Sequence, residues 1–247
     1  MKKKIKLVEF LINNYGYSEK EAMAFIMAGR VLINDKVITS PYYHIKDTDN
    51  IRIKEKKRYV SRGAYKLLTA FKHFDINVKD KITIDIGSST GGFTEVLLQK
   101  GAKRVYAVDC GKNQIDYSLR INPKVVVIEN RVIQSLVKTD FPENVEFAVM
   151  DVSFTSSIPI IEHIFLNLDI KDLIVLIKPQ FEFKRYREIL SLSSDFRGIV
   201  NAEDRDKIIE AVKEEILNMN LEISGVVESE IKGTKGNLEY IFYIKRK

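Results

Sequence analysis

From residue 81 onward, short apolar runs alternate with stretches that have helical apolar spacing. The runs lie at residues 82–86, 105–108, 125–128, 147–150, 173–177, 223–227 and 238–244. Short apolar runs of this kind are typical of buried parallel strands, and their alternation with helices favours a doubly wound α/β sheet. Ligands of such sheets bind beyond the carboxyl ends of the strands, so residues that follow the runs are the first candidates for a site.

The first quarter of the chain has a different pattern. Residues 7–15 and 18–28 have the apolar spacing of two short helices, and residues 31–38 have the pattern of a tight hairpin. A further strand is predicted at residues 51–54. We therefore expect three parts: a small α+β domain over residues 1–56, a charged linker over 57–61 and the α/β domain over 62–247.

Basic charge is concentrated in the same first quarter. The chain has 40 basic and 34 acidic residues, a net charge of +6. Up to Lys66 there are 15 basic and 7 acidic residues, which leaves 25 basic and 27 acidic residues for the rest. A basic module on a near-neutral body suggests a polyanionic partner, nucleic acid first and an anionic membrane second. A lysine-rich solvated surface is the alternative explanation.

Several classes of protein are excluded by the residues that the chain lacks. Its one cysteine, Cys110, allows neither an internal disulfide nor a cysteine-based zinc site, and His44, His73 and His163 form no metal-binding motif. The most apolar region, residues 158–177, is interrupted by charged residues and does not reach the roughly 18 apolar residues of a spanning helix. No signal peptide is recognisable. We expect a cytoplasmic protein without a metal.

A glycine-rich loop follows the first apolar run of the second domain. It is neither a dinucleotide fingerprint nor a P-loop, and Asp109 ends the next run, where an acid can bind a ribose diol. Together the two features resemble the S-adenosylmethionine site of class I methyltransferases. The candidate cofactor-binding residues are Asp85, Gly87, Ser88, Ser89, Thr90, Gly91, Gly92, Phe93 and Asp109.

Four charged residues are predicted to meet at the same edge of the sheet. Lys66 precedes the first strand, Asp151 and Lys178 follow the fourth and fifth, and Glu239 lies inside the last. Such a set suits methylation of a ribose 2′-hydroxyl, a weak acid that must be aimed and relieved of its proton. Lys178 is the candidate to take or steer that proton, with Asp151 holding it and the other two orienting the groups. Each residue alone could equally be an ordinary surface charge.

The run AMAFIMAGRVLINDKVI, residues 22–38, resembles the S4 domain, a small RNA-binding module. Asp35 stands where that family usually has glycine in the turn, and the first helix opens with lysines. Basic side chains suit phosphates because they supply charge and several donors. The RNA contacts that the resemblance implies are Lys4, Lys6, Lys20, Arg30 and Lys36. Arg62, beside the linker, is a further candidate.

Six motifs in order along nearly the whole chain resemble the TlyA family. They are YVSRGAYKL, DIGSSTGGF, VYAVDCG, DVSF, IKPQFE and KGNLEYIF. The resemblance implies an S4 domain joined to an FtsJ-like methyltransferase domain, a Rossmann-like class I sheet of seven strands with the last one antiparallel. It further implies that S-adenosylmethionine is the cofactor, that a cytidine 2′-hydroxyl in ribosomal RNA is the target, and that a ribosomal subunit is the partner. The implied catalytic residues are Lys66, Asp151, Lys178 and Glu239.

Two segments depart from the family pattern. After IKPQFE the family continues with Gly-Lys-Gly-Gly, whereas this chain has FKRYREILSLSSDFRGIV and keeps only Gly198. This loop is expected to cover the substrate, so the choice of nucleotide can differ. After the third strand, Glu129, Asn130 and Arg131 also depart from the family, and Asn130 is the candidate contact for the adenine.

Two other functions stay open. The first is a non-catalytic ribosome assembly factor that binds RNA on a methyltransferase fold, which the altered loop allows and the four charged residues disfavour. The second, less favoured, is a haemolysin or other membrane-active protein, as the family's alternative name suggests.

Overall fold

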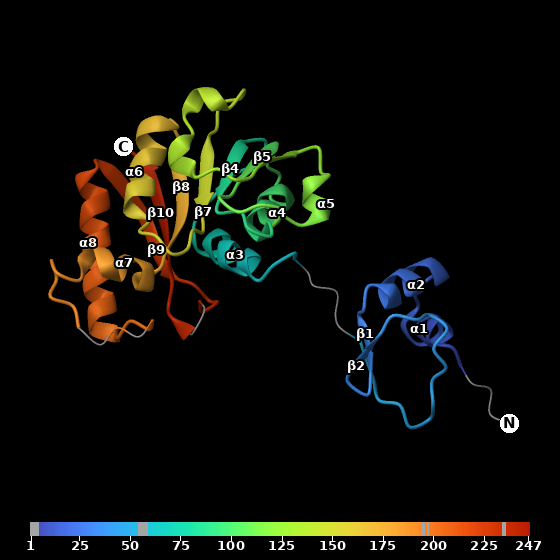
Figure 1. Ribbon diagram of the computed structural model, residues 1–247. Coiled ribbons are helices and arrows are strands. Elements are labelled where there is room, and N and C mark those ends of the chain that lie inside the picture. Colours follow the sequence, from blue (N-terminus) through green and yellow to red (C-terminus); the bar gives the residue numbers. More distant parts are fainter. Residues whose placement is uncertain (1–4, 54–58, 194–195, 197, 234–235) are drawn as a thin grey trace. The chain divides into compact units, whose positions relative to one another are not determined.

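The computed structural model describes residues 5–53, 59–193, 196, 198–233 and 236–247. The chain divides into two compact units, Met1–Arg58 and Tyr59–Lys247 (Figure 1). The linker predicted at residues 57–61 falls partly outside the described residues. Within it, Tyr59 is buried in the core of the second unit, edge-on to the ring of Tyr65.

The first unit packs two helices, α1 (Leu7–Tyr15) and α2 (Glu19–Met27), beside a small antiparallel sheet. The sheet has the order β2-β1-β3, with β1 at Val31–Ile33, β2 at Lys36–Ile38 and β3 at Ile51–Ile53. The apolar faces of both helices meet β1 in one core, which contains Leu7, Leu11, Ala22, Ile26 and Val31. The predicted helices and hairpin are therefore present, with ends within one residue or two of those expected.

The hairpin turn explains how this chain manages without the usual glycine. Asn34 and Asp35 have φ values of +51° and +62°, the left-handed pair that a tight two-residue hairpin requires. Asparagine and aspartate tolerate this region better than other residues with side chains. The Asn34 amide also donates to Asp49 at 2.9 Å and its oxygen accepts from Asn50 N at 2.9 Å, which ties the turn to the start of β3.

The second unit is built on a seven-stranded sheet in the order β6-β5-β4-β7-β8-β10-β9. Within this sheet, strands β4 to β8 are parallel to one another. Strand β10 runs antiparallel to both of its neighbours, as the sequence implied. The strands are β4 (Ile82–Ile86), β5 (Arg104–Val108), β6 (Val125–Ile128), β7 (Phe147–Met150), β8 (Asp172–Ile177), β9 (Leu221–Glu228) and β10 (Tyr240–Arg246).

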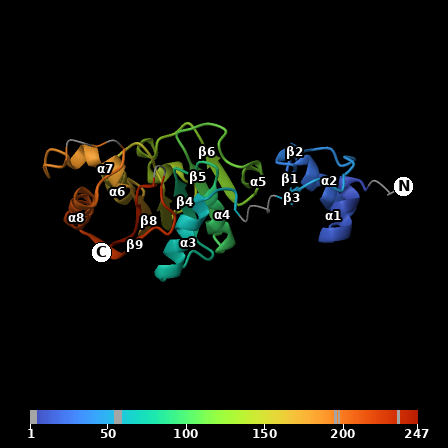
Figure 2. The same cartoon turned by 90° about the horizontal axis from the view of Figure 1, so that it is seen from below.

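Helices cover both faces of this sheet (Figures 1 and 2). Helices α3 and α4 pack on one face, α6, α7 and α8 pack on the other, and α5 lies beside β5 and β6. Two short 3-10 turns precede β7, at Ile133–Ser135 and Lys138–Asp140. The helices are α3 (Gly63–His73), α4 (Gly92–Gln99), α5 (Tyr117–Arg120), α6 (Ile158–Asn167), α7 (Pro179–Tyr186) and α8 (Ala202–Asn218).

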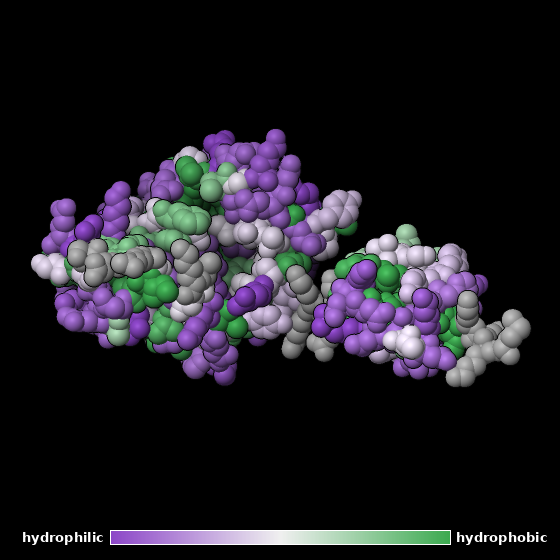
Figure 3. Space-filling model, turned by 60° about the horizontal axis from the view of Figure 1, so that its bottom comes forward, coloured by the Kyte–Doolittle hydropathy of each residue, from purple (hydrophilic) through white to green (hydrophobic). Residues whose placement is uncertain are grey.

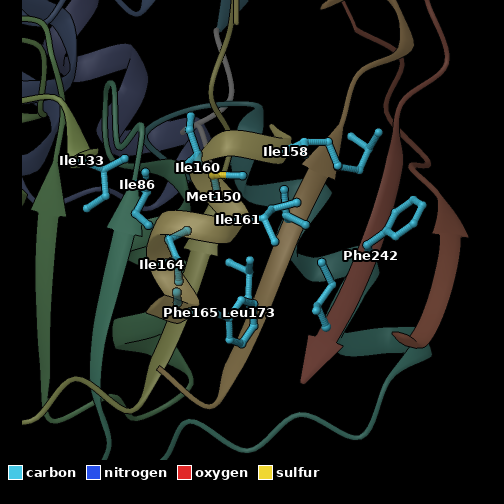
Figure 4. Packing of buried hydrophobic residues seen from close by; sticks show 14 of the residues in the cluster. Ile86, Ile133, Met150, Ile158, Ile160, Ile161, Ile164, Phe165, Leu173 and Phe242 are labelled. Carbon is cyan, nitrogen blue, oxygen red and sulfur yellow. The ribbon is translucent and has the colours of Figure 1, made fainter. Parts of the chain in front are cut away.

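The larger core joins the sheet to α6 and α8. Figure 4 shows Ile161, Ile164 and Phe165 of α6 lying over the strands that carry Met150 and Leu173, with Phe242 of β10 to one side in the same cluster. Burying one such side chain stabilises the fold by roughly 1.5–3 kcal/mol. Alternate residues of the same strands face α3 and α4 in a second core. This two-sided burial holds the carboxyl ends of the strands as a rigid edge.

Glu239 lies outside the last strand, contrary to the prediction. Strand β10 begins at Tyr240, which pairs with Ile177 at the end of β8. The chain turns into α7 at Pro179, so β8 offers residue 239 no partner in the ladder. Glu239 therefore precedes β10, at the sheet edge that the sequence indicated.

No helix among the described residues is long and apolar enough to cross a membrane. Figure 3 shows apolar side chains exposed in several separate places among hydrophilic ones on the second unit.

Candidate active site

A cavity of about 820 Å³ opens beyond the carboxyl ends of β4, β7 and β8. Its walls come from the turn before α3, the glycine-rich loop, the segment after β7, the start of α7 and the segment before β10. The sequence-predicted residues in its lining are Arg62, Lys66, Gly87, Ser88, Ser89, Thr90, Gly92, Phe93, Asp151, Lys178 and Glu239. The loop that departs from the family pattern contributes Phe196 and Gly198.

The glycine-rich loop lies directly against the catalytic candidates. Gly87 has a φ of +79°, and a Cβ atom there would be 2.8 Å from the backbone oxygen of Asp151. Its N–H and that of Ser88 donate to Val108 O at 2.9 and 3.1 Å, which ties the loop to the end of β5. Only glycine permits both the conformation and the close approach.

Two predicted cofactor residues lie behind the cavity wall. Asp109 accepts hydrogen bonds from Ser89 N at 2.8 Å and Gly111 N at 2.7 Å, so its carboxylate holds the loop to the end of β5. Gly91, with a φ of +94°, packs against Leu119 of α5. Neither lines the cavity.

Asp85 also lies behind the loop, fully buried within β4. Its Oδ2 accepts a hydrogen bond from Thr94 Oγ1 at 2.6 Å, while Oδ1 has no hydrogen-bond partner among the described residues. Burial raises the pKa of this carboxyl to about 7, an effect that its hydrogen bonds with Thr94 only partly offset. Asp85 is therefore a buried acid without a cation, close to the negative charges of Asp151 and Asp109.

The four predicted catalytic residues come together in a chain of alternating charge. Lys66 Nζ is 2.6 Å from Glu239 Oε2 and 3.8 Å from Asp151 Oδ2. Lys178 Nζ is 2.5 Å from Asp151 Oδ1. The order is thus Glu239, Lys66, Asp151, Lys178, with two positive and two negative groups.

These four side chains are largely removed from water. The exposed fraction is 3% for Glu239, 7% for Lys178, 13% for Lys66 and 19% for Asp151. Buried charges are costly unless they are paired, so the chain must assemble as a unit. Besides its ion pair with Asp151, Lys178 donates hydrogen bonds to Val152 O at 2.8 Å and to Ser153 Oγ at 3.1 Å.

Sequence reasoning missed several residues of this site. Phe154 is 91% exposed at the cavity, has a φ of +65° and lies 5.2 Å from the ring of Phe181. Asn237 is buried in the cavity wall, and its side-chain amide donates a hydrogen bond to Gly198 O at 2.7 Å. Both belong to motifs already noted, DVSF and KGNLEYIF, but a motif does not reveal which members face a cavity.

The predicted RNA contacts of the first unit are mostly solvent-accessible. Lys20 and Lys36 are exposed, Lys6 lies over the ring of Tyr42 at 5.6 Å, and Arg30 lies over Phe25 at 5.5 Å. Lys4 is outside the described residues.

Two further predictions concern the second unit. Arg62 is exposed at the N-terminus of α3. Asn130 is exposed, donates its N–H to Gly111 O at 3.0 Å and does not line the cavity.

Within the described ranges, no group of three or more histidine, cysteine, aspartate or glutamate side chains could hold a metal ion.

Comparison with known proteins agrees with the motifs. The chain is 39% identical over 236 residues to Hemolysin A of Brachyspira hyodysenteriae, covering 93% of this chain and 95% of that protein. It is 33% identical over 233 residues to the 16S/23S rRNA (cytidine-2′-O)-methyltransferase TlyA of Mycobacterium tuberculosis, covering 92% of this chain and 84% of that protein.

Solved structures agree as well. A hemolysin-named protein of Streptococcus thermophilus matches with a TM-score of 0.71 and 34% identity, over 99% of this chain and 89% of that one. The resemblance to the TlyA family is thereby confirmed. The model of the FtsJ-like methyltransferase family matches residues 59–246, and the chain belongs to that family.

Proposed function

We propose that this protein transfers a methyl group from S-adenosylmethionine to the 2′-hydroxyl of a cytidine ribose in ribosomal RNA. The observation that carries the proposal is the buried chain of alternating charge formed by Glu239, Lys66, Asp151 and Lys178 at the cavity. A ribosomal substrate makes this a cytoplasmic activity.

The residues around the cavity fit the cofactor. The cavity volume of about 820 Å³ lies within the range of roughly 300–1,000 Å³ that is typical of ligand pockets. The missing side chain at Gly87 lets the loop lie close against Asp151, because a Cβ atom there would be 2.8 Å from the Asp151 backbone oxygen. Residues 87–90 would hold the amino-acid end. Asp109 would act through this loop, because its carboxylate accepts Ser89 N–H and Gly111 N–H and so fixes the loop in place. When bound, the cofactor supplies an electrophilic methyl group.

Lys178 is the residue that we assign to the hydroxyl proton. It forms an ion pair with Asp151 and donates to Val152 O and Ser153 Oγ, and the contact with Ser153 is the longest at 3.1 Å. A ribose hydroxyl can replace Ser153 beside Lys178 Nζ, which can then take or steer the hydroxyl proton while it stays in contact with Asp151 and Val152 O.

Lys66 is suited to aim the same hydroxyl. It is held by Glu239 at 2.6 Å, whereas its distance to Asp151 is 3.8 Å, so it keeps N–H donors for a substrate oxygen. Fixing the reacting oxygen in line with the methyl group supplies much of the rate of such transfers.

Phe154 provides a platform for the target base. An exposed aromatic ring at the cavity can stack with a nucleobase, which contributes about 1–3 kcal/mol per base. The exposed basic residues of the first unit, among them Lys20 and Lys36, would hold the phosphates of the surrounding RNA.

The test is transfer of labelled methyl from S-adenosylmethionine to ribosomal subunits, comparing wild type with Lys178→Ala. We expect label on a cytidine 2′-oxygen with wild type and at least about 100-fold less with the variant. Lys171→Ala, an exposed lysine just before β8 and at the opposite end of that strand from Lys178, is the matched control and keeps full activity.

Three other outcomes contradict the proposal. Equal transfer by Lys178→Ala would remove the proposed role of this lysine. No transfer to either subunit or to intact ribosomes, with the cofactor bound, would mean a different substrate. No transfer and no cofactor binding would leave an RNA-binding assembly factor.

A further inference from the structure

The segment from Asp151 to Ser157 connects β7 to α6 and contains one strained residue. Phe154 has a φ of +65°, in the left-handed region that bulky side chains rarely adopt. Its side chain is 91% exposed, so its own packing does not hold this conformation. Strain of this kind persists only where the neighbouring residues fix the backbone.

On the N-terminal side of Phe154, Lys178 fixes the segment. Its ammonium donates to Val152 O at 2.8 Å and to Ser153 Oγ at 3.1 Å. The same ammonium pairs with Asp151, so one buried lysine contacts three consecutive residues.

On the C-terminal side, Glu182 fixes the segment. This carboxylate is fully buried, accepts the Ser156 hydroxyl at 2.5 Å and accepts Ser157 N–H at 2.6 Å. Within the described part of the chain, no lysine or arginine forms an ion pair with it. Burial raises the pKa of Glu182, while the bonds from Ser156 and Ser157 oppose that rise.

Helix α6 needs this carboxylate at its N-terminus. Ser157 is the N-cap residue of α6, yet its side chain makes no capping hydrogen bond. The first N–H groups of a helix have no partner within it and attract negative charge. From α7, Glu182 accepts the N–H of the N-cap residue Ser157 and the Ser156 hydroxyl, whose oxygen in turn accepts Ile158 N–H at 3.4 Å. These contacts fix the orientation of the segment as well as its end.

Lys178 and Glu182 are one helical turn apart. Lys178 is the N-cap residue of α7 and Glu182 lies in its first turn. The two side chains therefore hold the same segment on either side of Phe154.

We propose that Glu182 is a positioning residue for the reaction: by holding Ser156 and Ser157 it keeps Phe154 presented to the cavity and keeps Asp151, Val152 and Ser153 in place around Lys178. Its effect on catalysis rests on the function proposed above. Its effect on the segment does not, and can be measured without any methyl transfer.

The kinetic test compares Glu182→Ala with Glu182→Gln. We expect the alanine variant to lose about 10- to 100-fold in kcat, since small misplacement of reacting groups costs that much, with KM for S-adenosylmethionine within about twofold of wild type. Glutamine can still accept from Ser157 N–H and bond to Ser156, so it should recover most of the loss. Glu162→Gln, an exposed glutamate of α6, is the matched control. Equal kcat for wild type and the alanine variant overturns the proposal, as does an equal loss in both Glu182 variants.

The structural test uses fluorescence. The chain has no tryptophan, so Phe154→Trp places a single reporter on the segment. Adding Glu182→Ala should lower the anisotropy of this tryptophan, and adding Glu182→Gln should leave it nearly unchanged. Ser156→Ala, which removes one of the two hydrogen bonds, serves if Glu182→Ala does not fold, and should lower the anisotropy less.

The two readouts separate the proposals. Lower anisotropy on adding Glu182→Ala, together with a wild type that methylates nothing, would contradict the proposed function and support the positioning of the segment by Glu182. Unchanged anisotropy on adding either Glu182→Ala or Ser156→Ala would show that Glu182 does not position the segment, whatever the methyltransferase activity.

Discussion

The second unit holds two lysines buried at its cavity, whereas the first unit presents two exposed lysines among the predicted RNA contacts. In the second unit, Lys66 and Lys178 are 13% and 7% exposed and lie between carboxylates. In the first unit, Lys20 and Lys36 are exposed, and neither has an ion-pair partner among the described residues. Burial fixes one pair in a single geometry, whereas exposure leaves the other free to follow a flexible polyanion. Under the function proposed above, the same residue type would serve aimed chemistry in one unit and charge attraction in the other.

The sharpest way to break this comparison is to remove the carboxylate between the buried lysines. Asp151→Asn leaves Lys66 and Lys178 near each other without the negative charge that separates them. We expect kcat to fall by about 10³-fold, because proton transfer and alignment both depend on Lys178 staying in place. Steady-state kinetics and cofactor affinity measure this.

A matched control for that variant is Asp80→Asn. Asp80 is exposed and has a φ of +60°, a conformation that asparagine tolerates equally well. It should keep wild-type kcat. Wild-type kcat in Asp151→Asn as well would contradict the role given to the charge chain.

Asp85 shows what a buried charge costs when it has no lysine. Burial raises its pKa to about 7 from an ordinary 3.8, so the folded state keeps a proton that the unfolded state loses. The free energy of unfolding should therefore fall as pH rises from about 4 to about 7 and then level off. Three pKa units set an upper bound of roughly 4 kcal/mol. We expect Asp85→Asn to match wild type near pH 4 and to exceed it by about 2–3 kcal/mol above pH 7.

Denaturant unfolding of the cofactor-free protein from pH 4 to pH 8 tests this. Wild type and Asp85→Asn should diverge as pH rises. Parallel curves would show that Asp85 is ionised in the folded protein across this range.

Much of this arrangement could be predicted from the sequence, because it depends on local pattern. Apolar runs located the seven strands, and the rule that ligands bind beyond carboxyl ends brought Asp151 and Lys178 to one edge. Glu239 was placed there by an antiparallel last strand, and Lys66 was added by its motif. The positions of Asp85 and Asp109 behind the wall could not be predicted. Whether a residue at a strand end faces a cavity or a neighbouring loop depends on packing against segments far away in the sequence.

The contact of Glu182 with Ser156 and Ser157 illustrates the same limit. Glu182 lies in α7, whereas Ser156 and Ser157 precede α6 and are 26 and 25 residues away in the sequence. The left-handed conformation of Phe154 gave no signal either, since its residue type argues against it. Such features arise only when the segments are packed together.

Glu239 offers a milder way to disturb the buried lysines. A Cβ atom at Gly233 would be 2.1 Å from Glu239 Oε1, so Gly233→Ala should push this carboxylate away from Lys66. We expect kcat to fall about 10-fold, with little change in melting temperature because the backbone at Gly233 is not left-handed. Unchanged kcat would mean that Lys66 does not depend on Glu239 for its position.

The smallest effect is expected from the exposed lysines. Lys36→Ala should weaken RNA binding by a few-fold and reduce the slope of log affinity against log salt by about 1, as for the loss of one phosphate contact. Cofactor affinity should not change, because the lysine lies in the first unit. Lys46→Ala, another exposed lysine of that unit outside the predicted contacts, is the control and should keep the wild-type slope. Equal slopes for both variants and wild type would mean that Lys36 is solvated and contacts no phosphate. The contrast between buried lysines that position the substrate and exposed lysines that attract RNA would then lose its second half.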